Sequence, residues 1–176
     1  MARASLLKHT VVDTAVGWLA IVGSETGLRR ISTHDSLDAA IQSLSTDFPE
    51  SIDSPSDFGD LAERIKQYTR GERVTFDDKL DLANATPFQQ TVWQATRDIP
   101  HGETRSYEWI ANRIVKPKAA RAVGQALNRN PFPIIVPCHR VIGKSGGLIG
   151  FSCGLDIKRC LIELESRGLP NLTKIR

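Results

Sequence analysis

The segment that most constrains the fold is an apolar run that is closed by a proline and followed by a cysteine and a histidine. The run, Ile134 to Val136, is β-branched, and Pro137 ends it because proline fixes φ and donates no hydrogen bond to a sheet. The pattern predicts a buried strand with Cys138 at its end and His139 beside the thiol. A cysteine attacks as the thiolate, which a neighbouring base generates. A small buried residue next to a surface histidine is the alternative.

The cysteine count narrows the chemistry further. Cys138, Cys153 and Cys160 all lie in the last quarter of the 176 residues. An odd number of cysteines, in a chain whose N-terminus lacks the pattern of a secretion signal, argues against a disulfide framework. None of the three has the spacing of a zinc site, so we expect no metal and no cofactor.

Hydropathy favours a globular protein. No apolar run approaches the roughly 20 residues that span a bilayer, so we expect no membrane contact. We therefore expect the protein in the cytoplasm, or in the nucleus if the organism is a eukaryote. No segment indicates an obligate protein partner.

Charge divides the chain into two unlike halves. Residues 1–85 carry 9 Lys+Arg against 14 Asp+Glu, whereas residues 86–176 carry 14 against 6. Basic residues are densest between Arg97 and Lys144, where nine face only three acids. The C-terminal half is therefore the one expected to contact a polyanion. A solvated basic surface without a ligand is the alternative.

The N-terminal half has the pattern of a small α+β domain. Two apolar, β-branched runs, Thr14 to Val22 and Leu28 to Ile31, flank a turn and predict a hairpin. Apolar residues at helical spacing follow the N-cap Ser36 and recur over residues 58–68. We expect residues 1–85 to form an antiparallel sheet with helices that supports the rest of the chain.

The C-terminal half opens with strong helix signals. Thr86 and Gln89 form a capping box around Pro87, which predicts a helix start and a domain boundary just before it. Residues 86–176 should form a mostly helical domain, so the fold class is α+β.

Two short helical patterns, Ser106 to Val115 and Lys118 to Asn128, are separated by a tight break and predict a helix-turn-helix. On the second helix Arg121 and Gln125 share an exposed face. Ala119 and Ala120 leave the start of that helix without bulk, so it could approach DNA closely. A plain helical hairpin is the alternative.

The last helical pattern, Asp156 to Arg167, follows a glycine-rich stretch over residues 143–154. Glu165 falls at the edge of its apolar stripe, where a half-buried carboxylate would hold a histidine.

Several motifs together carry a family resemblance. They are TPFQQTVW at 86–93, KAARAVGQAL at 118–127, NRNP at 128–131 and PCHRVI at 137–142. In this order they make the chain resemble the O6-alkylguanine-DNA alkyltransferases, also called methylated-DNA–protein-cysteine methyltransferases. Members of that family repair DNA by transferring an alkyl group irreversibly from the O6 of guanine to their own cysteine. The resemblance is dense from Thr86 to Ser166.

The resemblance implies catalytic roles. Cys138 would be the acceptor, His139 the base acting through a water, and Glu165 the partner that orients and charges the histidine. Asn130 would brace the site. We accordingly expect Cys138 to ionise more readily than an ordinary cysteine.

The resemblance also implies how double-stranded DNA containing O6-alkylguanine is bound. Tyr107, Val141 and Ser152 would contact the flipped base. Arg121 would fill the gap that this base leaves, on a helix whose Ala119, Ala120 and Gln125 face the DNA in the minor groove.

Three residues depart from the family pattern. Where Tyr-x-Gly-Gly is usual, this chain has Phe151, Ser152, Cys153 and Gly154, and Cys153 is expected to narrow the substrate site. Cys160 stands where tryptophan is common, and the zinc site of some relatives is missing.

Two rival functions fit parts of the pattern. A cysteine hydrolase would use the same nucleophile, base and carboxylate, but would release product repeatedly. A helix-turn-helix protein that only marks damaged DNA would not need Cys138.

Overall fold

The computed structural model describes residues 6–150 and 153–167. These residues divide into two compact units between Leu82 and Ala83. Within the described ranges, no helix has the length and apolar character needed to cross a membrane.

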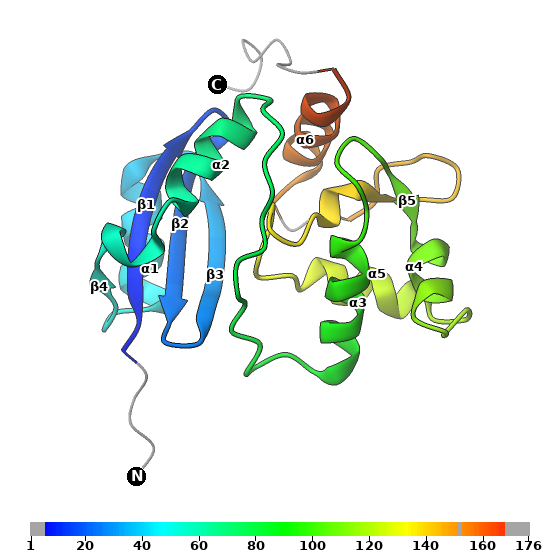
Figure 1. Cartoon of the computed structure of the whole chain (residues 1–176), viewed down its shortest axis with the longest axis horizontal. Helices are drawn as coiled ribbons and strands as arrows, with labels where there is room; N and C mark the ends of the chain where they lie inside the picture. Colours follow the sequence, from blue (N-terminus) through cyan, green and yellow to red (C-terminus); the bar gives the residue numbers. More distant parts are fainter. Residues whose placement is uncertain (1–5, 151–152, 168–176) are drawn as a thin grey trace. The chain divides into compact units, whose positions relative to one another are not determined.

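The N-terminal unit is built on a four-stranded sheet (Figure 1). The strands are β1 (Lys8–Thr14), β2 (Gly17–Ser24), β3 (Gly27–His34) and β4 (Ile52–Asp53), in the order β3-β2-β1-β4. The first three are antiparallel neighbours, and β4 pairs parallel to β1. The expected hairpin is β2–β3, so that prediction is confirmed, but β1 was not expected. The antiparallel arrangement explains why short turns suffice to connect β1, β2 and β3.

Two helices cover the sheet, α1 (Leu37–Asp47) on one face and α2 (Leu61–Thr69) on the other (Figure 1). Five consecutive residues of the central strand β2 are buried, because both of its faces are covered. On the α1 side, Ala20 and Val22 of the strand pack against Ala40 and Leu44 of the helix. Ser36 caps α1 through its side chain, as the sequence predicted. A short 3-10 turn, η1 (Pro55–Phe58), precedes α2.

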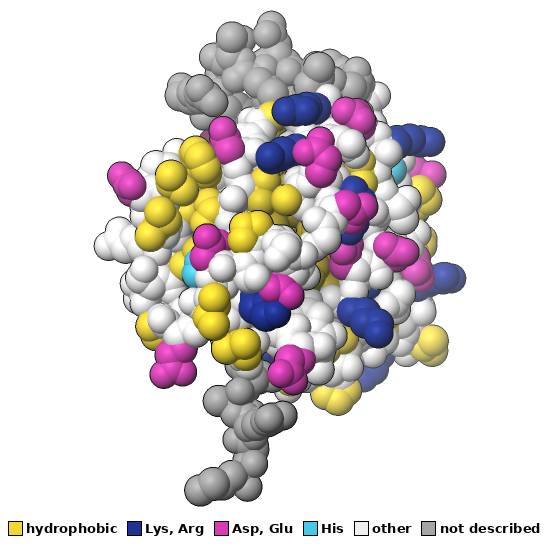
Figure 2. Space-filling view, turned by 60° about the vertical axis from the view of Figure 1, so that its left-hand side comes forward, with side chains coloured by type: hydrophobic (Ala, Val, Ile, Leu, Met, Phe, Trp, Pro, Cys, Tyr) yellow, Lys and Arg dark blue, Asp and Glu magenta, His cyan; other side chains and the backbone are white. Residues whose placement is uncertain are grey.

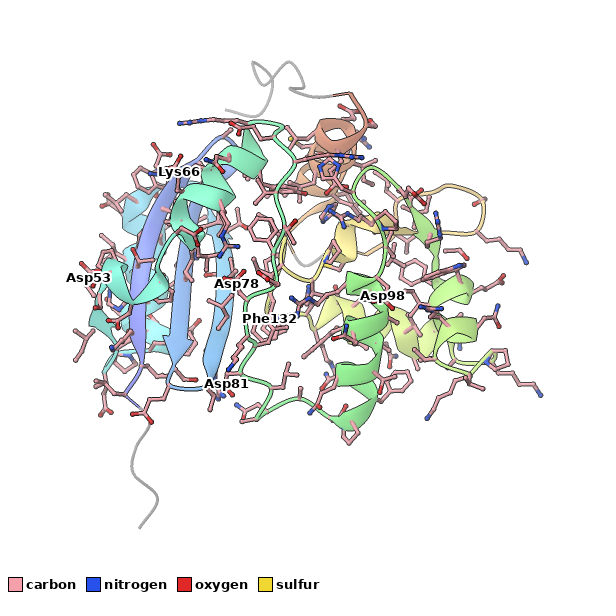
Figure 3. The ribbon with its side chains drawn as sticks, in the orientation of Figure 1. Asp53, Lys66, Asp78, Asp81, Asp98 and Phe132 are labelled. Carbon is pink, nitrogen blue, oxygen red and sulfur yellow. The ribbon has the colours of Figure 1, made fainter. Side chains whose placement is uncertain are left out.

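The segment after α2 is fixed along this unit by two Arg–Asp pairs. Arg64 donates to both carboxylate oxygens of Asp78 at 2.7 and 2.9 Å. Arg29 donates to Asp81 at 3.0 Å, and both aspartates are labelled in Figure 3. On the side of the molecule shown in Figure 2, acidic and basic side chains are interspersed among apolar ones and form no continuous basic surface.

The C-terminal unit is mostly helical. It contains α3 (Pro87–Arg97), α4 (Tyr107–Arg113), α5 (Ala120–Asn128), the 3-10 turn η2 (Cys138–Arg140) and α6 (Leu155–Arg167), with β5 (Arg105–Ser106) paired parallel to β6 (Val141–Ile142). Both bonds of the predicted capping box are present at Thr86 and Gln89. Trp93 of α3 stacks edge-on against Phe132 and donates to the Ala126 carbonyl at 3.0 Å. The predicted α+β fold class is confirmed.

The strand predicted at residues 134–136 is wrong. These residues form a buried turn in which the Val136 amide donates to the Phe132 carbonyl at 2.8 Å and Ile134 has a φ of 75°. The positive φ of Ile134 is incompatible with an extended strand, and Pro133 and Pro137 on either side lack the N–H groups that would extend a ladder. Cys138 therefore opens the η2 turn and does not end a strand.

The turn between α4 and α5 has the hydrogen bonds of a Schellman motif. The Val115 amide donates to the Asn112 carbonyl at 3.0 Å, and the Lys116 amide donates to the Ala111 carbonyl at 2.8 Å. In this motif the residue at the position directly after the C-cap has a positive φ and is therefore usually glycine. Val115 occupies it with a φ of 57° and a side chain that is 85% exposed.

Replacing Val115 by glycine should therefore stabilise the protein. A non-glycine residue in the left-handed conformation costs the folded state roughly 1–2 kcal/mol. Glycine removes this cost, but its greater freedom in the unfolded chain offsets about half of the gain. We therefore expect the free energy of unfolding to rise by about 0.5–1 kcal/mol. Little packing is lost, because the side chain is exposed. Thermal unfolding measures the change, with Val115→Ala as the control that keeps the left-handed residue. An alanine variant as stable as the glycine variant would refute the explanation.

Candidate functional site

Cys138 lies at the start of η2 with its side chain almost fully buried, at 3% exposure. The side-chain amide of Asn130 donates to its Sγ at 3.1 Å and to the Val136 carbonyl at 3.0 Å. The carbonyl oxygen of Asn130 accepts from the Phe132 amide at 2.9 Å. Because that oxygen is held by an N–H donor, the nitrogen must face the sulfur, where a donor favours the thiolate.

The resting protein nevertheless keeps this thiol protonated. Burial raises the pKa of Cys138 to about 12, and the Asn130 hydrogen bond and the charge of Lys158 offset only part of that effect. The expectation that Cys138 ionises more readily than an ordinary cysteine is therefore wrong for the protein alone. The physical cause of the raised pKa is the loss of water around the sulfur, which disfavours the charged thiolate.

His139 and Glu165 are brought together as the sequence suggested. Nε2 of His139, on η2, lies 2.9 Å from Oε1 of Glu165, on α6, and both side chains are buried. A carboxylate only accepts, so Nε2 carries the hydrogen, and Nδ1 of the neutral ring is the acceptor. Burial lowers the pKa of His139 although Glu165 opposes this effect. The imidazole is thus a neutral base in the resting protein.

Arg140 is a site residue that the sequence reasoning missed. It donates to both carboxylate oxygens of Glu165 at 2.8 and 2.9 Å, and to the Ile99 carbonyl at 2.7 Å. Burial alone would raise the pKa of Glu165, but hydrogen bonds from His139 and Arg140 hold it well below its ordinary value. Arg140 thereby balances the carboxylate, which is why Glu165 orients His139 but does not charge it. Its position directly after the Cys-His pair was the available signal.

Lys158 is a second missed residue. Its side chain is fully buried, and Nζ donates to the Val141 carbonyl at 2.7 Å and to the Ile149 carbonyl at 3.0 Å. Burial lowers the pKa of Lys158. The hydroxyl of Tyr107 donates to the same Ile149 carbonyl at 2.7 Å. The sequence signal that could have identified Lys158 is its helical spacing on α6, because it lies three residues before the buried Leu161 and seven before Glu165.

A cavity of about 470 Å³ lies between α4, α5 and the loop that follows β6. Its lining includes Tyr107, Arg121, Gly124, Gln125, Ile149 and Gly150. Arg121 and Gln125 come from the exposed face of α5 that the sequence identified. Ala120 also lines the cavity, and Ala119 is the N-cap residue of α5. The helix-turn-helix and the cavity therefore form one surface.

The other residues that the resemblance placed near the substrate are only partly described by the structure. Ser152 and Phe151 lie outside the described residues, and Cys153 is half-buried just before α6. The Val141 carbonyl is taken by Lys158 in the resting protein. Across residues 6–150 and 153–167, no cluster of three His, Cys, Asp or Glu side chains is placed to hold a metal ion.

Fold and site together define a helix-turn-helix protein with a buried cysteine beside a histidine–glutamate pair. The family model described as "6-O-methylguanine DNA methyltransferase, DNA binding domain" matches residues 87–167, and the one described as "6-O-methylguanine DNA methyltransferase, ribonuclease-like domain" matches residues 7–82. The chain belongs to the 6-O-methylguanine DNA methyltransferase family, so the resemblance is confirmed.

Curated relatives agree with this assignment. A methylated-DNA–protein-cysteine methyltransferase of Methanosarcina acetivorans is 40% identical over 89% of this chain and 97% of its own length. The one from Mycobacterium tuberculosis strain H37Rv is 41% identical over 94% and 96%.

Solved structures agree as well. The crystal structure of Mycobacterium tuberculosis OGT in complex with DNA has a TM-score of 0.82 at 39% identity, covering 96% of this chain and 98% of that one. The O6-methylguanine-DNA methyltransferase of Pyrococcus kodakaraensis has a TM-score of 0.64 at 26% identity, covering 91% and 99%.

Removing Arg140 should destabilise the protein strongly. Arg140→Met leaves the Glu165 carboxylate buried without a cation, and breaking a buried pair in this way typically costs about 3–5 kcal/mol. Arg140→Lys keeps the positive charge but loses the two-pronged contact, so its loss should be smaller. Urea denaturation at neutral pH measures both. Equal losses in the two variants would show that packing of the side chain, and not its charge, is what matters.

Proposed function

We propose that the protein repairs double-stranded DNA by transferring an alkyl group, chiefly methyl, from the O6 of guanine to Sγ of Cys138. The observation that carries the proposal is the Asn130 amide aimed at a buried thiol, 3.1 Å away, next to the His139–Glu165 pair. The family membership and the names of the relatives support it. We assign the chemistry and DNA binding to residues 86–176 and a supporting role to residues 1–85.

The proton on Cys138 has to leave before the sulfur attacks. With a thiol pKa of about 12, little thiolate exists at neutral pH, so the proton is removed during the reaction. His139 takes it on Nδ1 through a water, and Glu165 stabilises the imidazolium that forms. Sγ then attacks the alkyl carbon, and the bond from carbon to O6 breaks with its electron pair left on guanine. The guanine takes up one proton on its ring from water, and the imidazolium of His139 returns to water the proton that came from Cys138, so the overall proton count is unchanged.

Binding of the alkylated guanine changes the hydrogen-bond partners of the residues that line the site. The Tyr107 hydroxyl releases the Ile149 carbonyl and hydrogen-bonds the guanine ring. The Val141 carbonyl has a second lone pair, so it accepts from the exocyclic amine of guanine while it still accepts from Lys158. Ser152 contacts O6. These contacts hold the base with its alkyl group toward Cys138.

The base reaches this site by leaving the duplex. Unstacking a nucleotide costs a few kcal/mol, and Arg121, exposed on α5, fills the gap and lowers that cost. Ala119 and Ala120 let the helix approach the minor groove closely, and Gln125 faces the same groove. Readout there is degenerate, which suits a search for lesions in any sequence.

The reaction ends with the first transfer, because a thioether neither ionises nor leaves in water. No cofactor or obligate protein partner is required, and we expect the protein to act in the cytoplasm, or in the nucleus of a eukaryote. A cysteine hydrolase would regenerate Cys138 and turn over repeatedly. A protein that only marks damage would leave the DNA alkylated.

The mass of the intact protein after incubation with duplex DNA containing O6-methylguanine tests this function. We expect a gain of one methyl group per molecule, located on Cys138, and none for Cys138→Ser. Cys160→Ser, which removes another buried thiol, should gain the methyl group as the unmodified protein does. Repeated demethylation by a protein of unchanged mass would rule out the acceptor role.

Replacing Arg121 by alanine should slow methyl transfer more on duplex DNA than on single-stranded DNA. We expect methyl transfer from duplex DNA to slow on the order of tenfold, about 1.4 kcal/mol, with a smaller loss on single strands, where no stack is refilled. Arg129→Ala is the matched control, because Arg129 is exposed at the end of the same helix. The measurement is the single-turnover rate of methyl transfer for each variant on each of the two substrates. Equal losses of Arg121→Ala on the two substrates would contradict the gap-filling role.

A further inference from the structure

Lys158 is a buried charged residue that the proposed transfer step does not use. It lies on α6 with its side chain fully buried, and Nζ donates to two neutral backbone carbonyls, those of Val141 at 2.7 Å and Ile149 at 3.0 Å. Taking an ammonium group out of water is costly, and hydrogen bonds to carbonyls offset only part of that cost. An apolar residue of similar length would fill the same space at a lower cost. The contacts of Nζ, and not packing, therefore distinguish lysine at this position.

Both carbonyls belong to segments around the substrate site. Val141 opens β6 directly after η2, and its amide donates back to the Cys138 carbonyl. Ile149 lies in the loop after β6 and lines the cavity of about 470 Å³. The Tyr107 hydroxyl donates to the same Ile149 carbonyl at 2.7 Å, and Nζ of Lys158 lies 5.9 Å from the centre of the Tyr107 ring. One ammonium group therefore connects β6, the loop that follows it and the start of α4.

The contact with Val141 restricts how that carbonyl can be used. A backbone carbonyl oxygen has two lone pairs, and a donor prefers to approach along one of them. Nζ of Lys158 takes one of these directions at 2.7 Å, a distance typical of charge-assisted hydrogen bonds. A second donor therefore has to approach from the other direction. Lys158 thus holds the carbonyl in one orientation and leaves one acceptor position.

The contact with Ile149 keeps Nζ in place when the substrate binds. In the function proposed above, the Tyr107 hydroxyl leaves the Ile149 carbonyl. That carbonyl still accepts from Lys158 at 3.0 Å, so the ammonium group does not have to move. The helix that carries Lys158 is itself fixed, because Glu165 on the same face of α6 is hydrogen-bonded to η2.

We propose that Lys158 is a positioning residue that makes the site selective for alkylated purines with a 2-amino group. It holds the Val141 carbonyl in the orientation that accepts a hydrogen bond from this amine. Lys158 does not touch the substrate and acts only through Val141. The amine reaches the carbonyl once the Tyr107 hydroxyl has left Ile149. The inference rests on the proposed function, in which the Val141 carbonyl contacts the exocyclic amine of guanine.

A substrate that lacks only the amine isolates this contact. O6-methylhypoxanthine is O6-methylguanine without the 2-amino group, so it has no donor for the Val141 carbonyl. Both bases are placed in the same single-stranded oligonucleotide, so that the cost of unpairing does not differ between them. The measurement is the ratio of the two single-turnover rates of methyl uptake, followed by intact mass. Because both rates come from one preparation of protein, the folded fraction cancels in the ratio.

The unmodified protein should react about three- to tenfold faster with O6-methylguanine than with O6-methylhypoxanthine, the effect of one hydrogen bond. Lys158→Met keeps the length of the side chain but removes Nζ, so both rates should fall and the ratio should approach one. Tyr107→Phe removes a contact to the ring and not to the amine, so it should slow both reactions and retain the ratio. Arg159→Met is the matched control for charge, because Arg159 is exposed on the same helix. It should retain both the rates and the ratio.

Three results would overturn the positioning role. The first is an unchanged or larger ratio in Lys158→Met, because a merely structural role slows both reactions alike. The second is a ratio that drops equally in Tyr107→Phe, since any lost contact would then have the same effect. The third is a ratio of one in the unmodified protein, which would leave no amine contact to position. If the unmodified protein took up no methyl group from O6-methylguanine, the proposed function itself would fail, and the inference with it.

Discussion

A buried carboxylate needs hydrogen bonds on both oxygens, and Glu165 obtains them from donors on separate segments. His139 and Arg140 reach it from η2, and the Gly102 amide reaches it at 3.1 Å from the segment before β5. Because the side chain is only 2% exposed, none of these donors is easily replaced by water. The position of η2 relative to α6, and with it that of Cys138, follows from this one group.

The same network surrounds a thiol that stays protonated, and therefore unreactive, in the protein alone. Arg140 offsets the charge of Glu165, so burial lowers the pKa of His139 and the ring stays neutral. Burial also raises the pKa of Cys138 and keeps it a thiol. A thiol in this state reacts poorly with small electrophiles that diffuse in from solvent. Under the proposed function, selectivity for a base presented by DNA comes from a substrate that changes the contacts of Tyr107 and Val141.

The sequence predicted features that depend on neighbouring residues along the chain. The N-caps Ser36 and Thr86, and the helix after Ser106, formed as expected because capping is local. The turn at residues 134–136 was misread, since its apolar residues are equally typical of a strand. Arg140 and Lys158 were missed because a charged side chain is normally exposed, and only the tertiary structure shows that their partners are buried carboxylate and carbonyl oxygens.

The residue that follows Asn130 bears on how long the protein stays intact. Asparagine side chains age by deamidation, in which the next residue's backbone nitrogen attacks the amide carbon and closes a cyclic imide. That next residue is Pro131, whose nitrogen carries no hydrogen, so this ring closure is blocked. An aspartate formed there would turn an oxygen lone pair toward the sulfur in place of an N–H. The Asn-Pro dipeptide thus closes the usual chemical route by which the amide that faces Cys138 would be lost with age.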